Sequence, residues 1–286
     1  MISLPANWLK EHSLGKGDDI NLELMDDNLV ISSAKSGSKK QTEITLRDLT
    51  ESSIRTLITN TYRKGYDKII VKFDNTDQFN ILNNVIRTRL IGFDVVKKEK
   101  NSCIVENITE PSADQFENIL SKVFMNIETL FDITKNRLEG KKPEENYNDV
   151  ETRIMQYDNF CRRVISKRSF VKQKKEFFWS YLHLIDHGHR ELYHLNNVLG
   201  NFKVSKQVID FLDLAKKMFM LSKKAYLDKD TKALSEMHTL NKDAFYKIGY
   251  KTIEKLKGKE NLIFYYLLAC LRKFFQSNSP LSGLIL

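Results

Sequence analysis

The sequence predicts an α+β protein with more than one domain, and three of its features lead to this expectation. The chain has 286 residues, which is longer than most single domains. Apolar residues alternate at strand spacing in short runs over the first third, whereas they recur at helical spacing over the rest. The hydrophobic fraction is 41% against 29% charged residues, which is enough apolar surface to form cores.

The first expected unit covers residues 1–36 and is small and rich in strands. Pro5 is suited to the start of a short helical turn. Residues 20–24 alternate between apolar and polar side chains, and a polar turn separates them from a returning strand at residues 29–31. A unit of this size cannot bury a core of its own, so we expect it to form a homodimer. The residues expected at the dimer contact are Leu4, Leu14, Ile20, Leu22, Leu24, Leu29 and Ile31.

A second unit is expected over residues 42–109, after a polar linker. Thr50 can cap a helix that Gly65 ends, and a second helix is expected over residues 77–90. Four strands are expected near residues 43–46, 68–73, 93–97 and 103–108. The order β-α-β-α-β-β predicts a small α/β sandwich with one layer of helices on a sheet. This segment contains no glycine-rich phosphate loop and no Ser-His-Asp or Cys-His arrangement.

The third unit, residues 111–286, is predicted to be helical throughout. Ser112 and Gln115 have the spacing of a capping box at the start of its first helix. Pro143 and Pro280 are assigned to breaks in the helices. Five further helices are expected near residues 145–168, 172–199, 204–228, 230–257 and 259–276. Six helices with short connections predict two antiparallel three-helix bundles or one composite bundle, and the two halves have the pattern of a repeat.

Cysteine content, hydropathy and charge indicate the cellular compartment of the protein and the charge of its binding partner. The three cysteines are far apart and odd in number, so we expect reduced core thiols in a cytoplasmic protein. They are Cys103, Cys161 and Cys270. We expect no signal peptide, because no basic segment precedes an apolar run at the amino terminus, and no membrane insertion, because the apolar stretches are too short. The net charge is −3 over residues 1–36, +3 over 37–110 and +9 over 111–286, so an anionic partner would meet the helical unit first.

The order of these units resembles that of a known family. The first unit resembles the swapped-hairpin DNA-binding domain of the AbrB/SpoVT type, in which two chains interlace their hairpins. The residues that carry this resemblance are Ile2-Ser3-Leu4-Pro5, Trp8, Leu14-x-Lys16-Gly17-Asp18-x-Ile20 and Leu29-Val30-Ile31. The third unit resembles PhoU domains, which are paired three-helix bundles. The fusion of the two is similar to archaeal PhoU-like phosphate uptake regulators, through Tyr62-Arg63-Lys64-Gly65-Tyr66-Asp67, the Glu110-Pro111-Ser112 junction and the stretch from Ser277 to Gly283.

The resemblance implies a non-enzymatic, cytoplasmic homodimer that binds DNA and regulates transcription in phosphate uptake or related signalling. A phosphate-transport protein or another acidic protein is a second candidate partner. Residues 1–36, however, hold 3 basic and 6 acidic residues, and DNA binding depends on neutralising phosphates. The alternative is therefore a dimeric interaction regulator whose hairpin module only dimerises and does not bind DNA.

Metal binding is weighed at two places in the helical unit. PhoU proteins with metal clusters use acidic residues at i and i+4, but Arg190 stands four residues after Asp186, so we expect no cluster and no cofactor. Four of the six histidines lie within residues 183–194. His183 and His187 are one helical turn apart, and with Asp186 they could hold a single Zn or Ni ion. The alternative is that these residues only form hydrogen bonds across the bundle; an enzyme built on them is a third hypothesis.

A run of basic residues spans the end of the second expected helix of the helical unit and the start of the third. It places seven cations within 14 residues: Arg162, Arg163, Lys167, Arg168, Lys172, Lys174 and Lys175. This run is a candidate surface for nucleic acid, phosphate or an acidic protein. The alternative is a solvated helix end, because cations are favoured at the carboxyl terminus of a helix.

Overall fold

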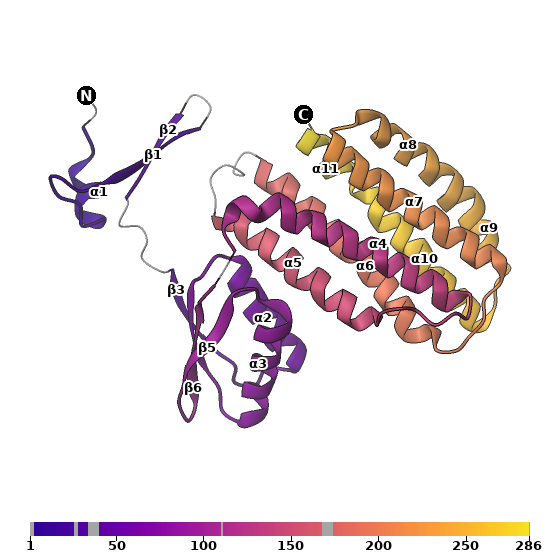
Figure 1. Ribbon diagram of the computed structural model, residues 1–286, viewed down its shortest axis with the longest axis horizontal. Coiled ribbons are helices and arrows are strands. Elements are labelled where there is room, and N and C mark those ends of the chain that lie inside the picture. The colour runs from indigo at the N-terminus through magenta and orange to yellow at the C-terminus, as the bar shows by residue number, and fades with distance from the viewer. Residues whose placement is uncertain (1–2, 26–27, 34–39, 110, 168–173, 286) are drawn as a thin grey trace.

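The protein has an α+β fold in which helices predominate (Figure 1). The computed structural model describes residues 3–25, 28–33, 40–109, 111–167 and 174–285. Three parts follow one another along the chain: a hairpin unit (residues 6–33), an α/β unit (residues 41–107) and a helical unit (residues 113–285). Within the described ranges, no helix combines the length and the apolarity that a bilayer crossing requires.

The hairpin unit consists of one short helix and two strands, and it lies apart from the other elements in Figure 1. These elements are α1 (Ala6–Glu11), β1 (Ile20–Met25) and β2 (Asn28–Ser33). The strands pair antiparallel, with Leu22 opposite Ile31. Neither strand pairs with any further strand in the part of the chain that the structure describes. A two-stranded ladder of this kind has too little apolar contact to be stable by itself.

The α/β unit has the β-α-β-α-β-β element order that the sequence predicted. Its elements are β3 (Gln41–Thr45), α2 (Glu51–Arg63), β4 (Lys68–Lys72), α3 (Thr76–Arg89), β5 (Phe93–Lys98) and β6 (Ser102–Asn107). The sheet order is β3-β4-β6-β5, with β3 and β4 parallel and the other pairs antiparallel. The Thr50 hydroxyl caps α2 by accepting a hydrogen bond from the Ser53 amide, and Gly65 follows its end with a φ of +83°. Both helices lie on one side of the sheet (Figure 1).

The helical unit is organised around one continuous core. Its main elements are α4 (Phe116–Leu138), α5 (Tyr147–Lys167), α6 (Lys175–Leu199), α7 (Lys206–Asp228), α8 (Thr231–Asn241), the π-helix η4 (Lys242–Gly249), α9 (Tyr250–Ile253), α10 (Gly258–Gln276) and α11 (Asn278–Ile285). Rings from α4, α7 and α10 meet at its centre, where the Phe219 and Phe274 centroids are 5.0 Å apart. Buried side chains from both halves belong to the same cluster. Of the two arrangements left open by the sequence, one composite bundle fits this continuous core.

Three local expectations for the helical unit were wrong. Residues 113–115 form the 3-10 turn η2, and α4 begins at Phe116 without a side-chain cap, so the expected capping box does not form. The helix expected over residues 230–257 is divided by the π-helix η4. Pro280 lies in the first turn of α11 rather than in a break. A proline is tolerated there because the first N–H groups of a helix have no partner within the helix.

The expectation of reduced core thiols agrees with the structure. All three cysteines are unpaired and buried. Burial raises the pKa of the Cys103 thiol to about 11, and it also raises the pKa of Cys161 and Cys270. A thiol with a raised pKa is a poor nucleophile at neutral pH, so these groups act as apolar core side chains.

The α/β unit contacts the helical unit where α2 and α3 end against α5. The Arg163 side chain is fully buried and donates to the carbonyl oxygens of Tyr62 (2.9 Å) and Tyr66 (2.8 Å). The Asn159 amide donates to the Arg89 carbonyl at 2.8 Å. Arg163 thus binds carbonyls at and just after the end of α2, and Asn159 binds the last carbonyl of α3, so these side chains hold the two units together.

Helix α6 packs closely on α10 at Gly188, and this contact gives a testable prediction. A Cβ at Gly188 would lie 2.5 Å from Cε1 of the Phe274 ring. Because that ring is fully buried, it cannot swing aside freely. We expect Gly188→Ala to lower the free energy of unfolding by about 1–3 kcal/mol, measured by urea denaturation. Ser180→Ala on the exposed face of the same helix should change it by less than about 0.5 kcal/mol, and equal losses would contradict the close packing.

Candidate functional site

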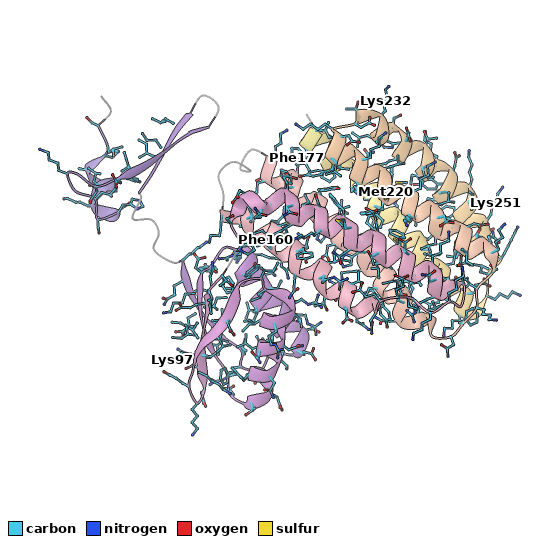
Figure 2. The ribbon with its side chains drawn as sticks, in the orientation of Figure 1. Lys97, Phe160, Phe177, Met220, Lys232 and Lys251 are labelled. Atoms are coloured by element: carbon cyan, nitrogen blue, oxygen red, sulfur yellow. The ribbon has the colours of Figure 1, made fainter. Side chains whose placement is uncertain are left out.

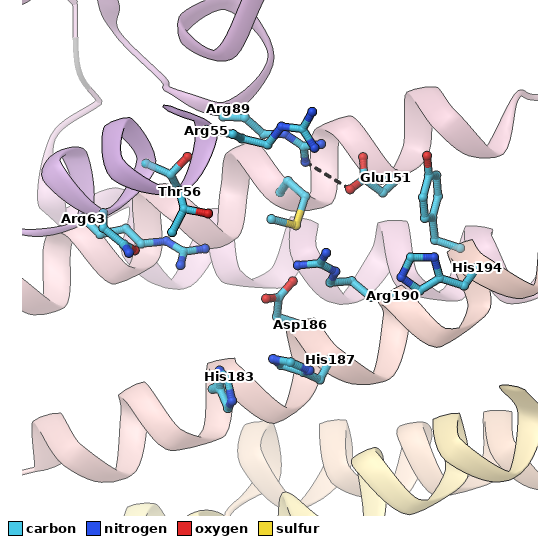
Figure 3. A pocket seen from close by; sticks show the side chains of 14 residues that line it. Arg55, Thr56, Arg63, Arg89, Glu151, His183, Asp186, His187, Arg190 and His194 are labelled. Carbon is cyan, nitrogen blue, oxygen red and sulfur yellow. Dashed lines mark hydrogen bonds and ion pairs between the residues drawn. The ribbon is translucent and has the colours of Figure 1, made fainter. Parts of the chain in front are cut away.

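A cavity of about 370 Å³ lies between the α/β unit and the helical unit (Figure 3). Elements α2, α3, α5 and α6 all contribute to its walls. Four of its lining residues are arginines, namely Arg55, Arg63, Arg89 and Arg190. Three are histidines, namely His183, His187 and His194. Only two lining residues are acidic, Glu151 and Asp186, so the wall carries more positive than negative charge.

Helical spacing explains why these side chains meet. On α2, Arg55, Thr59 and Arg63 recur every four residues, so they share one face. On α6, Asp186 and Arg190 are also four residues apart, and both point toward the space that α2 faces (Figure 3). The opposite faces of both helices carry apolar residues that enter the two cores. The polar faces of α2 and α6 are therefore turned toward each other.

Two arginines of this pocket are held by ion pairs. Nη1 of Arg89 lies 3.0 Å from Oε1 of Glu151. Nη2 of Arg63 lies 3.2 Å from Oδ2 of Asp158, and its Nε donates to the Asn159 side chain at 2.8 Å. Fixed guanidinium groups are preorganised for a ligand, because no side-chain freedom is lost when they bind.

Arg162 lies behind the pocket wall and shares the Asp158 carboxylate with Arg63. Its Nε is 2.7 Å from Oδ2 of Asp158, and both side chains are 2% exposed. Its Nη2 has no hydrogen-bond partner in the described parts of the chain. The guanidinium also lies over the Trp179 ring, 5.3 Å from its centroid. One carboxylate thus serves two largely desolvated cations, which makes Asp158 a central residue of this contact.

Asp186 and His189 form a buried pair on α6. Nδ1 of His189 is 3.7 Å from Oδ1 of Asp186, and neither ring nitrogen has a hydrogen-bond partner among the described residues. Burial lowers the pKa of His189, so its ring is neutral at ordinary pH. Burial also disfavours a charge on Asp186, but the neighbouring guanidinium groups of Arg162, Arg63 and Arg190 outweigh it and lower the pKa of this carboxyl. The pocket floor therefore holds one ionised carboxylate beneath several cations.

Arg190 differs from the other arginines of the pocket. It is exposed, and no hydrogen bond or ion pair joins it to a residue in the described ranges. Arg55 is likewise exposed but pairs with Glu51 on its own helix. The pKa of His183 is lowered by burial and by Arg162, and the pKa of His187 by burial and by His183. Neutral imidazoles of this kind can donate an N–H without adding charge.

A second hollow of about 850 Å³ adjoins this pocket. The two share Thr56, Asn60, Arg63 and His183. The second hollow adds the side chains of Leu49, Leu57 and Trp179. The cationic pocket is thus bordered by a less polar groove along α2.

The three residues considered for a metal ion all line the cationic pocket. His183 and His187 have ring centroids 4.2 Å apart, and Asp186 lies beside them. Across the described ranges, however, no three His, Cys, Asp or Glu side chains are placed to share an ion. The alternative, hydrogen bonds from these side chains across the bundle, is likewise not observed among the described residues. Four arginines in the same wall oppose the entry of a divalent cation. The expectation that no cofactor is bound stays a prediction.

The basic run does not form one surface, and this expectation is corrected by burial. Arg162 and Arg163 are 1% and 0% exposed, so they are interior residues of the contact between the units. Lys167 bonds to Asp67 at 2.7 Å, and Lys174 donates to the Leu284 carbonyl at 3.1 Å. Lys175 begins α6, whereas Arg168 and Lys172 lie outside the described residues. The α/β unit covers Arg163 through Tyr62, Tyr66 and Asp67, whereas Arg162 lies against Asp158 and the Trp179 ring.

The residues predicted to form the dimer contact are placed unevenly in the hairpin unit. Ile20, Leu22 and Leu29 are 37%, 57% and 45% exposed. Leu4, Leu14 and Ile31 are half-buried, and the side chain of Leu24 lies outside the described residues. The hairpin therefore presents an apolar surface that other described elements leave uncovered.

Sequence reasoning identified the α6 histidines but not the pocket around them. Arg55, Arg63, Arg89 and Glu151 come from three other helices, and their spacing along the chain gives no sign that they meet. The available signal was the spacing of Arg55 and Arg63 on α2, which are eight residues apart and therefore lie on nearly the same face. No known family model matches the chain, and no curated protein or solved structure is detectably similar to it.

Proposed function

We propose that this chain is a non-enzymatic, homodimeric regulator of transcription that binds DNA through its hairpin unit. The observation that carries the proposal is the β1–β2 ladder, which pairs with no other strand in the described ranges and exposes Leu22 and Leu29. Two copies that interlace their hairpins would cover these side chains in a common barrel, as the resemblance to the AbrB/SpoVT type implies. The helical unit would then act as a PhoU-like domain linked to phosphate uptake or related signalling.

A second candidate function is a dimeric interaction regulator that does not bind DNA. It is favoured by the charge of residues 1–36, which is −3, because phosphate contacts need basic side chains. In this case the hairpin unit only dimerises, and the basic helical unit meets an acidic protein. The two candidates make opposite predictions for binding to duplex DNA.

A gel-shift experiment across salt concentrations separates the two candidates. We expect duplexes selected from a random library to bind the full chain at 50 mM salt, and the affinity to fall steeply toward 200 mM. Replacing the exposed Lys10 and Lys16 with Gln should weaken binding and reduce the salt slope by about 1 per lost phosphate contact. The matched control is Lys97→Gln with Lys98→Gln, on the sheet and away from the hairpin (Figure 2).

Two results would decide against DNA binding through the hairpin. If no selected duplex binds at 50 mM salt, the interaction regulator is the better description. If both double variants lose the same affinity, the positive charge acts as a diffuse field rather than through the hairpin unit.

A further inference from the structure

We propose that the cationic pocket between α2 and α6 binds a small molecule that carries a phosphate group, with Arg190 and Arg63 as its principal contacts. The proposed DNA-binding function neither requires nor assigns this site, so the two proposals stand independently.

The charge of the pocket favours an anion. Its wall holds four arginines against two carboxylates. Glu151 already pairs with Arg89, and the buried Asp186 carboxylate lies among Arg63, Arg162 and Arg190. Arg55 and Arg63 also have carboxylate partners, Glu51 and Asp158. With Arg162 behind the wall, five guanidinium groups stand against these four carboxylates, so one positive charge remains in excess. An anion entering the pocket would therefore gain Coulombic energy in partly desolvated surroundings.

Arg63 and Arg190 have N–H donors that bond to no residue in the described ranges. Arg63 uses Nε and Nη2 for Asn159 and Asp158, which fixes its plane, and its Nη1 has no partner within the described ranges. Arg190 engages none of its donors with a described residue. Figure 3 shows the side chains of Arg63, Arg89 and Arg190 converging on one space. Planar guanidinium groups fit the oxygens of a phosphate two at a time, and convergent donors suit its tetrahedral shape.

The surroundings indicate a ligand larger than a free ion. The pocket volume of about 370 Å³ lies within the range of small-molecule sites. The adjoining groove brings Trp179 and Leu57 next to Arg63 and His183, which line both spaces. A molecule with a phosphate at one end and an apolar or aromatic group at the other would use both parts. His183 and His187, with lowered pKa values, add N–H donors without competing for the anion as cations.

The test is calorimetric titration of the full chain at low salt with inorganic phosphate, AMP and ATP, and with citrate as an anion without phosphorus. We expect at least one phosphate-bearing probe to bind about tenfold or more tightly than citrate. Arg190→Gln should weaken that binding about tenfold or more, because a charge-assisted hydrogen bond is lost. This variant should fold normally, since Arg190 is exposed and holds no described residue.

The control is Arg87→Gln on α3, which removes the same charge from an exposed arginine outside the pocket. It should change the affinity less than about twofold. Arg55→Gln provides a second pocket variant, expected to weaken binding in the same direction as Arg190→Gln.

Three outcomes would overturn the proposal. They are the absence of binding by any phosphate-bearing probe up to about 1 mM, equally tight binding of citrate, and equal losses in Arg87→Gln and Arg190→Gln. Gel shifts with the Arg190→Gln chain keep the two proposals apart. A chain that binds DNA but none of the probes contradicts only the pocket, and a chain that binds a probe but no DNA contradicts only the hairpin.

Discussion

Replacing Asp158 with alanine is expected to lower the free energy of unfolding by about 3–5 kcal/mol. Asp158 is 2% exposed and accepts hydrogen bonds from Arg162 at 2.7 Å and from Arg63 at 3.2 Å. Without this carboxylate, the buried Arg162 guanidinium loses its only described carboxylate partner. Arg63 keeps only its bond to Asn159 and is still largely withdrawn from water. The cost of leaving charges buried and unpaired exceeds that of losing an exposed ion pair.

Equilibrium urea denaturation, followed by the fluorescence of Trp179 near Arg162, measures this loss. The matched control is Asp213→Ala, which breaks an ion pair with Lys135 whose side chains are 49% and 38% exposed. That change should cost less than about 1 kcal/mol, because water screens the pair. If the two alanine variants lose equal stability, Asp158 contributes no more than a surface residue, and the account of the contact between the units fails.

The sequence was sufficient to predict those helices and strands whose boundaries are set by neighbouring residues. Thr50 and Gly65 bound α2 because a cap hydroxyl and a left-handed backbone act within a few residues. The π-helix η4 could not be predicted, since residues 242–249 keep a helical apolar pattern whether each N–H bonds four or five residues back. The prediction that Pro280 lies in a helix break was wrong. Proline is compatible both with a loop and with the first turn of a helix, and the sequence alone does not distinguish them.

The candidate site depended on contacts between distant segments. Arg162 and Arg163 belong to a run with the composition of an exposed basic surface. Packing against the α/β unit makes Arg163 an interior residue, and Arg162 is buried beside Asp158 and the Trp179 ring of α6. Arg63 and Asp158 are 95 positions apart, yet they form one ion pair. Spacing along one helix identifies which side chains share a face, but not which other helix that face meets. The histidines of α6 were therefore predicted as a cluster, whereas the cationic character of their surroundings was not.

Substituting both Leu22 and Leu29 with lysine is expected to convert a dimer into a monomer. Both side chains lie on the hairpin and are about half exposed in the single chain. Covering them in a dimer would contribute about 1 kcal/mol each, so four such side chains contribute about 4 kcal/mol. Their loss should raise the dissociation constant roughly 1,000-fold, and the buried lysine charges would raise it further.

Light scattering at micromolar concentration tests this expectation against the chain mass of 33.5 kDa. The native chain should give twice that mass, and the Leu22→Lys, Leu29→Lys variant should give the single mass. Met220→Lys with Leu227→Lys is the matched control, because these residues are 37% and 46% exposed on α7, far from the hairpin (Figure 2). The control should remain dimeric, because removing apolar surface outside the contact leaves the dimer energy unchanged. A monomeric native chain would refute the hairpin dimer. A control variant that alone becomes monomeric would instead place the contact on α7.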